Sequence, residues 1–248
     1  MKGTFFSKPL EWNIDVQGES WQQGGALTGV LKVTNHGAEA VSLDSSGVAL
    51  AYAEIKKVQT RAEGSMKHEQ TANLGPRTLA KGESTELQFS FPLSSNAPVS
   101  DKKASYYLTY GKDFNESHLQ LKIEPKALYA KIIGLLDTFY RFKLKEYKAS
   151  KKGVEYKLIP PTSRDMANID SLLLTFSMNE DALKMDYDFQ VKKLDTSAVT
   201  TRLNKATVAI ERVVTPKEYS LGRDLLNQDQ LLKVVETVLS EVKLKSVF

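Results

Sequence analysis

The first half of the chain alternates apolar and polar residues in short runs that end at turn residues. In the run LEWNIDV (10–16), even positions are apolar and odd positions are polar. Similar runs follow at 26–37, 79–93, 104–111 and 118–125. This period of two predicts β-strands with one buried face. Residues 41–58 predict one or two further strands, and the polar stretch 60–73 predicts a loop or an exposed hairpin.

After Pro125 the pattern changes to the period of about 3.6 residues that is typical of a helix. Apolar residues fall on one face of a predicted helix over about 126–140. Strand-like runs resume between 142 and 214, and LKMDYDFQVKK (183–193) alternates most regularly. The stretch at about 218–244 predicts a second helix whose apolar stripe consists of Leu225, Leu232, Val235, Val238, Leu239 and Val242.

These elements predict a mainly β protein of two domains. Short antiparallel strands with no helices between them favour β-sandwiches. We expect an N-terminal sandwich over 1–125, and a C-terminal sandwich over 126–248 that includes the two helices. Each part has the size of an ordinary domain. The terminal helix could cover its own domain or pair with a second copy of the chain.

Several motifs resemble the arrestin family. A strand of the form GG-x-L-x-G-x-L-x-V comprises Gly24, Gly25, Leu27, Gly29, Leu31 and Val33. The family's later strand, proline-containing loop and tyrosine-ended strand correspond in order to Gly82, Glu83, Phe89, Phe91, Pro92, Pro98, Ser100 and Tyr110. The sequence departs from the family order in one place, because Pro92 precedes Leu93.

The second half is similar to the bacterial sporulation-control branch of that superfamily. The matching positions are Ile169, Asp170, Leu172, Leu174, Phe176, Asp188, Lys192 and Lys193. The resemblance covers about 10–195 and implies two tandem arrestin-like sandwiches of immunoglobulin type, with a helix between them and a helix at the end. It also implies a non-enzymatic adaptor or scaffold that binds other proteins through sheet edges and loops.

Composition narrows the functional classes. The chain has 248 residues, is 41% hydrophobic and 26% charged, and contains no cysteine. Disulfides, thiolate metal sites and cysteine nucleophiles are therefore excluded. The N-terminus lacks the apolar segment of a signal peptide, and no apolar run approaches the roughly 20 residues that span a bilayer. We expect a cytoplasmic protein that is either free or associated with a membrane surface.

Motifs for catalysis and cofactor binding are absent from the sequence. There is no G-x-S-x-G, G-x-G-x-x-G or P-loop motif, and His36, His68 and His118 are far apart along the chain. Asp186 and Asp188 share a strand face with lysines, as expected of a solvated charged face. We therefore expect no catalytic residue, no metal site, no cofactor and no enzymatic activity.

The strongest candidate for an interaction is the basic segment RFKLKEYKASKK (141–152). It has six basic residues and one acidic residue, whereas residues 1–125 have 13 basic and 14 acidic residues. Its cations could bind phosphates or anionic lipid head groups, or they could protect a solvated edge strand from aggregation. The candidate site residues are Arg141, Lys143, Lys145, Lys148, Lys151 and Lys152.

Two functions remain open from the sequence. The first is a cytoplasmic adaptor or regulatory protein with a protein partner. The alternative is a peripheral membrane module that binds anionic lipid or phosphate through the basic segment. The absence of a stacking platform or a recognition helix argues against nucleic acid. Self-association through sheet edges or the terminal helix is a further expectation.

Overall fold

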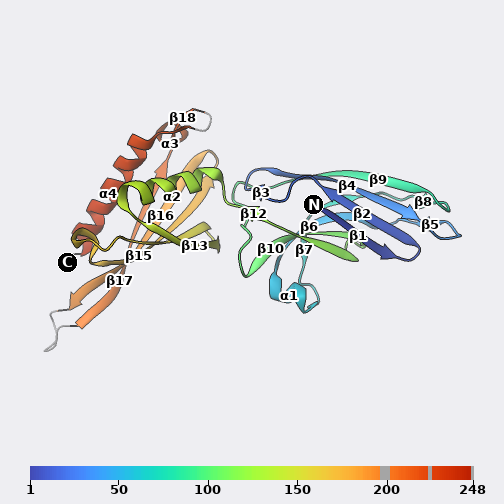
Figure 1. Cartoon of the computed structure of the whole chain (residues 1–248), viewed down its shortest axis with the longest axis horizontal. Helices are drawn as coiled ribbons and strands as arrows, with labels where there is room; N and C mark the ends of the chain where they lie inside the picture. The colour runs from blue at the N-terminus through green and yellow to red at the C-terminus, as the bar shows by residue number, and fades with distance from the viewer. Residues whose placement is uncertain (196–201, 223–224, 247–248) are drawn as a thin grey trace. The chain divides into compact units, whose positions relative to one another are not determined.

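The computed structural model describes residues 1–195, 202–222 and 225–246. The chain divides into two compact units, Met1–Glu124 and Pro125–Phe248, which we call the first unit and the second unit. Figure 1 shows that strands dominate both units and that the longer helices belong to the second.

The first unit contains two antiparallel sheets of four strands each. One sheet has the order β1 (Lys2–Ser7), β2 (Leu10–Val16), β4 (Ala26–Asn35) and β9 (Ser84–Pro92). The other has the order β11 (Ser117–Leu121), β10 (Ala104–Lys112), β6 (Ser46–Glu54) and β7 (Lys67–Asn73). Short elements complete the unit: β3 (Trp21–Gln22), β5 (Val41–Ser42), α1 (Ile55–Gln59), β8 (Thr78–Leu79) and β12 (Ile123–Glu124).

The apolar faces of these two sheets form one core. Trp12, Leu31 and Leu108 are fully buried in it, one on each of three strands. Phe89 and Phe91 of β9 join this core, whereas Ser90 between them is exposed. Burial of one such large side chain contributes about 1.5–3 kcal/mol, so the period of two in the sequence reflects the main stabilising force of the unit.

Residues 60–66 form a loop, as predicted, whereas strand β7 corrects the prediction for residues 67–73. It pairs antiparallel with β6 at the edge of its sheet, and the register shifts between Leu50 and Ala51. Five of its seven residues are exposed. An edge strand with so little burial shows no apolar alternation, so the sequence pattern did not reveal it.

The second unit contains one five-stranded antiparallel sheet. Its strands follow chain order: β13 (Lys143–Ser150), β14 (Gly153–Ile159), β15 (Ile169–Asn179), β16 (Ala182–Asp195) and β17 (Arg202–Val214). A single 3₁₀ turn, Arg164–Met166, precedes β15. Helix α2 (Ala127–Tyr140) lies where the sequence predicts a helix, and the ring of its Tyr129 stacks on Phe176 of β15 at 4.9 Å.

The mainly β fold class is confirmed, but the second layer of the second unit is a correction. In the described part of this unit, α2 and α4 cover the apolar face of the sheet, where the sequence predicts a second sheet (Figure 1). Met185 and Tyr187 of β16 line a small cavity together with residues of both helices. Helices with apolar stripes can cover a half-buried sheet face as well as another sheet can.

The C-terminal helix begins later than the prediction of 218–244. The described residues before it form α3 (Pro216–Tyr219), β18 (Ser220–Gly222) and β19 (Leu225–Leu226), and α4 spans Gln228–Ser246. Residues 223–224 of the predicted helix lie outside the described residues. Gly222 has a φ of +129°, which a right-handed helix does not allow. The apolar stripe of α4 is buried within its own unit at Leu231, Val235, Val238, Leu239 and Val242.

Candidate interaction surfaces

The six cations of the basic segment lie along one edge of the second unit's sheet. Arg141 ends α2 in the left-handed conformation, with a φ of +61°. Lys143, Lys145 and Lys148 belong to β13, which is the first strand of the sheet order. Lys151 and Lys152 form the turn to β14. Because β13 has eight residues, it separates the two ends of the segment by roughly 25 Å.

Carboxylates neutralise part of this positive charge. The Lys143 ammonium lies 2.5 Å from an oxygen of Asp137, and the Lys148 ammonium lies 2.8 Å from Glu155. Within the described ranges, Lys145 and Lys151 form no ion pair. Lys145 also lies where the pairing of β13 with β14 shifts register, between Leu144 and Glu146. The cations are therefore spread along the edge and partly paired.

Large apolar side chains are exposed beside the first half of β13. Phe139, in the last turn of α2, is 53% exposed, and Leu144 is 47% exposed. Ile159 of β14 is 37% exposed and pairs with Lys143 across the strands. Cations and apolar residues thus alternate at the place where α2 ends and β13 begins.

The first unit has a different exposed edge, formed by β1. This strand lies at the end of its sheet and pairs in regular register with β2. Its Phe6 is 64% exposed. A hollow of about 480 Å³ adjoins Phe6, and its lining consists of Phe6, Lys8, Pro9, Leu10, Glu11 and His36. Lys8 and Pro9 are joined by a cis peptide bond.

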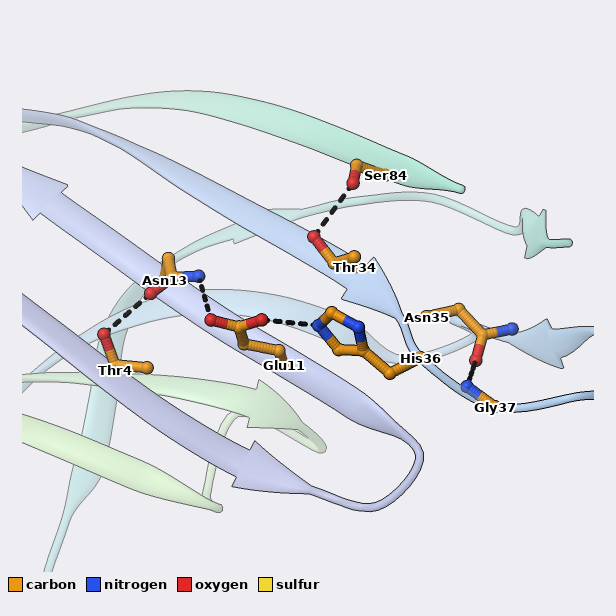
Figure 2. A network of polar contacts seen from close by, with 8 residues as sticks. All are labelled: Thr4, Glu11, Asn13, Thr34, Asn35, His36, Gly37 and Ser84. Atoms are coloured by element: carbon orange, nitrogen blue, oxygen red, sulfur yellow. Dashed lines mark hydrogen bonds and ion pairs between the residues drawn. The ribbon is translucent and has the colours of Figure 1, made fainter. Parts of the chain in front are cut away.

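A polar network holds the rim of this hollow (Figure 2). The Thr4 hydroxyl donates to Oδ1 of Asn13 at 2.7 Å, and Nδ2 of Asn13 donates to Glu11 at 2.9 Å. The second Glu11 oxygen lies 2.5 Å from Nε2 of His36. Hydrogen bonds from Asn13 and then His36 lower the pKa of the Glu11 carboxyl. The carboxylate is thereby held ionised and fixed in orientation.

The network depends on the turn that follows β4. Oδ1 of Asn35 accepts a hydrogen bond from the backbone N–H of Gly37 at 2.9 Å (Figure 2). The Asn35 amide donates to the backbone oxygens of Glu39 at 2.7 Å and Leu79 at 3.0 Å. Asn35 is fully buried, so these bonds satisfy its polar atoms and fix the turn that carries His36.

The other two histidines line a separate hollow of about 640 Å³ in the first unit. Nε2 of His68 lies 3.2 Å from the Thr109 hydroxyl, and the ring of His118 meets Tyr107 edge-on at 5.6 Å between centroids. Partial burial lowers the pKa of His118. In the described part of the chain, no three His, Asp or Glu residues are grouped so that they could hold a metal ion.

The charged face of β16 is internally paired. The Lys184 ammonium lies 3.5 Å from Asp186 and 2.7 Å from Glu211 of β17. A hydrogen bond from Lys184 is the main cause that lowers the pKa of Glu211. Cross-strand pairs of this kind are typical of a solvated sheet face.

None of the described helices is long and apolar enough to cross a membrane.

Comparisons with known proteins show the fold. No protein-family model and no curated protein sequence matches the chain. The sporulation control protein Spo0M from Bacillus subtilis matches 95% of this chain and 99% of its own, with a TM-score of 0.61 and 15% identity.

Two other solved structures match only in part. The β-glucosidase from Listeria innocua in complex with gluconolactone matches 46% of this chain and 16% of its own, at 12% identity and a TM-score of 0.29. The C-terminal domain of wzt matches 50% and 78%, at 10% identity and a TM-score of 0.28. Both likenesses are too weak to carry an argument. At the level of the fold, the predicted resemblance is confirmed, because the chain has the fold of Spo0M.

Proposed function

We propose that the chain is a non-enzymatic cytoplasmic regulatory protein that acts as an adaptor, binding another protein through its first unit. The observation that carries this proposal is the open edge of β1, with the exposed ring of Phe6 beside the hollow. The structural neighbour Spo0M is described as a sporulation control protein, which supports a regulatory role of the same kind.

The geometry suits an extended segment of a partner protein. An edge strand offers backbone N–H and C=O groups to an added strand, and nearby hollows select its side chains. The register between β1 and β2 is regular, so no bulge interrupts this edge. An apolar side chain of the partner would contact Phe6, Pro9 and Leu10, while the Glu11–His36 pair forms a polar rim.

The variant Phe6→Asp tests this proposal. The tagged chain is purified from the cells that produce it, and the enriched protein is then titrated against purified chain. We expect Phe6→Asp to weaken binding at least tenfold, because a buried unpaired carboxylate opposes the contact. The matched control is Leu244→Asp, which places the same charge at an equally exposed apolar position of α4. Equal binding by Phe6→Asp and the unchanged chain would exclude the β1 edge as the binding site for the partner protein.

A second function is favoured by the line of cations along β13. We propose that the basic segment binds anionic groups, either phosphates in solution or lipid head groups. Lys145 and Lys151 are the first candidates for this contact, since neither forms an ion pair with the described residues, whereas Lys143 and Lys148 do. Titrations with tripolyphosphate and with anionic vesicles at low ionic strength test it. Binding to neither of them would exclude the second function.

A further inference from the structure

We propose that the edge formed by β13 docks on the surface of an anionic bilayer, with Phe139 and Leu144 entering the boundary between head groups and acyl chains. This inference rests on the second proposed function and names the source of the anionic groups. The cations bind lipid phosphates while the two apolar side chains leave water.

Two exposed apolar residues, Phe139 and Leu144, distinguish this edge from an edge strand that is only protected by lysines. Lysines on an edge strand are explained by protection against strand addition, and the register shift in β13 has the same effect. Neither the lysines nor the register shift requires Phe139 and Leu144 to be exposed to solvent. Phe139 and Leu144 lie in elements that contact each other, at the end of α2 and the start of β13. Cations that alternate with apolar groups are the surface composition that binds membrane interfaces.

The spacing of the cations favours binding to a lipid surface over binding to a small soluble anion. Arg141 and Lys143 lie at one end of β13, and Lys151 and Lys152 follow its other end, roughly 25 Å away. One soluble phosphate can contact only one end at a time. A bilayer presents phosphates over the whole length, so all six cations can contribute together.

The charge balance shows why the apolar side chains are needed. Three carboxylates, those of Asp137, Glu146 and Glu155, accompany the six cations. The remaining excess of positive charge is small, and physiological salt screens its attraction to anionic groups. Burial of Phe139 and Leu144 adds attraction that salt does not weaken. Lipid binding should therefore persist partly at a salt concentration that abolishes tripolyphosphate binding.

Co-sedimentation of the full chain with vesicles tests the inference. Vesicles of phosphatidylcholine alone are compared with mixed vesicles that also contain phosphatidylglycerol. The double variant Phe139→Ser/Leu144→Ser should lower partition to the mixed vesicles roughly tenfold or more, because two large apolar groups no longer leave water. Its affinity for tripolyphosphate should stay unchanged. The matched control, Leu221→Ser/Leu244→Ser, removes two leucines that are at least as exposed elsewhere in the second unit and should partition normally.

A charge variant separates this inference from the function on which it rests. Lys145→Gln/Lys151→Gln should weaken binding to both mixed vesicles and tripolyphosphate. If only this variant reduces vesicle binding and Phe139→Ser/Leu144→Ser does not, the insertion is overturned and the electrostatic function stands. If the unchanged chain binds neither probe at low salt, both are overturned. Unchanged circular dichroism spectra and melting temperatures establish that the variants are folded.

Discussion

The two units bury their sheets in different ways. In the first unit, two four-stranded sheets face each other, and the core consists of side chains that alternate along strands. In the second unit, one five-stranded sheet presents its apolar face to α2 and α4. Strands in both units show the same period of two. Alternation along a strand therefore shows that one face is buried, but it does not show whether a sheet or a helix covers it.

The two units can be followed separately in solution, so the comparison can be tested. Both tryptophans, Trp12 and Trp21, belong to the first unit, and tryptophan fluorescence reports its unfolding. The two long helices belong to the second unit, so the helical signal in far-ultraviolet circular dichroism reports mainly on that unit.

The largest effect is expected when the helical layer of the second unit is broken. Val238 of α4 is fully buried, and Val238→Asp places an unpaired carboxylate in the core. We expect the free energy of unfolding of the second unit to fall by about 5 kcal/mol, measured by urea titration of the helical signal. Thr237→Asp, one residue away on the exposed side, should cost less than about 0.5 kcal/mol. A small effect of Val238→Asp would show that α4 is not the second layer.

A large-to-small substitution in the sandwich core should have the next largest effect. Leu31 of β4 is fully buried between the two sheets. Leu31→Ala leaves a cavity and should lower the free energy of unfolding of the first unit by about 3 kcal/mol, measured by tryptophan fluorescence in urea. The exposed neighbour on the same strand offers a control, since Lys32→Ala should change the midpoint little. A fall in the helical transition of equal size would instead mean that the two units unfold together.

The sequence predicted the elements that bury a continuous apolar face and missed those that do not. Strands β2, β4, β9 and β16 and helix α2 follow from their periodicity. Strand β7 was missed because most of its side chains are exposed. The start of α4 was placed too early because Leu225 continues the apolar period, although it is 63% exposed.

The candidate sites were predictable only where they are local in sequence. The basic segment is one continuous stretch, and its position on an edge strand agrees with the alternation of Phe142 and Leu144 with cations. The pairing of Glu11 with His36 joins residues 25 positions apart. It depends on the register of β2 with β4, which pairs Leu10 with Asn35. Periodicity alone does not give such a register.

The response to pH should also separate the two units, with a more modest effect. All three histidines belong to the first unit. Burial lowers the pKa of His118 from 6.5, so near this pH the folded state binds fewer protons than the unfolded chain. The stability of the first unit should therefore rise with pH between the lowered pKa and 6.5, and this contribution should be constant above that range. The second unit should show no such slope.

Fluorescence-detected urea titrations at a series of pH values measure this slope, and His118→Gln is the matched variant. The variant should lose the part of the slope that comes from His118. An unchanged slope would assign the pH response to other groups of the first unit. The same slope in the helical signal would contradict the separation of the two units.

The smallest effect is expected at the edge of the second sheet. The pair between Lys148 and Glu155 is solvent-exposed on the lysine side, so Lys148→Gln should lower the free energy of unfolding of the second unit by about 0.5 kcal/mol or less. The comparable pair of the first unit, Lys2 with Asp15 at 3.0 Å, should respond equally weakly to Lys2→Gln. Urea titrations with the two separate signals at low and high salt measure both effects. A loss above about 1 kcal/mol at Lys148 would show that the β13 edge supports the fold and would weaken its assignment as a ligand surface. If Lys148→Gln is nearly neutral, the ion pair between Lys148 and Glu155 contributes little to folding. Lys148 could then exchange Glu155 for an anionic ligand at little cost to the stability of the second unit.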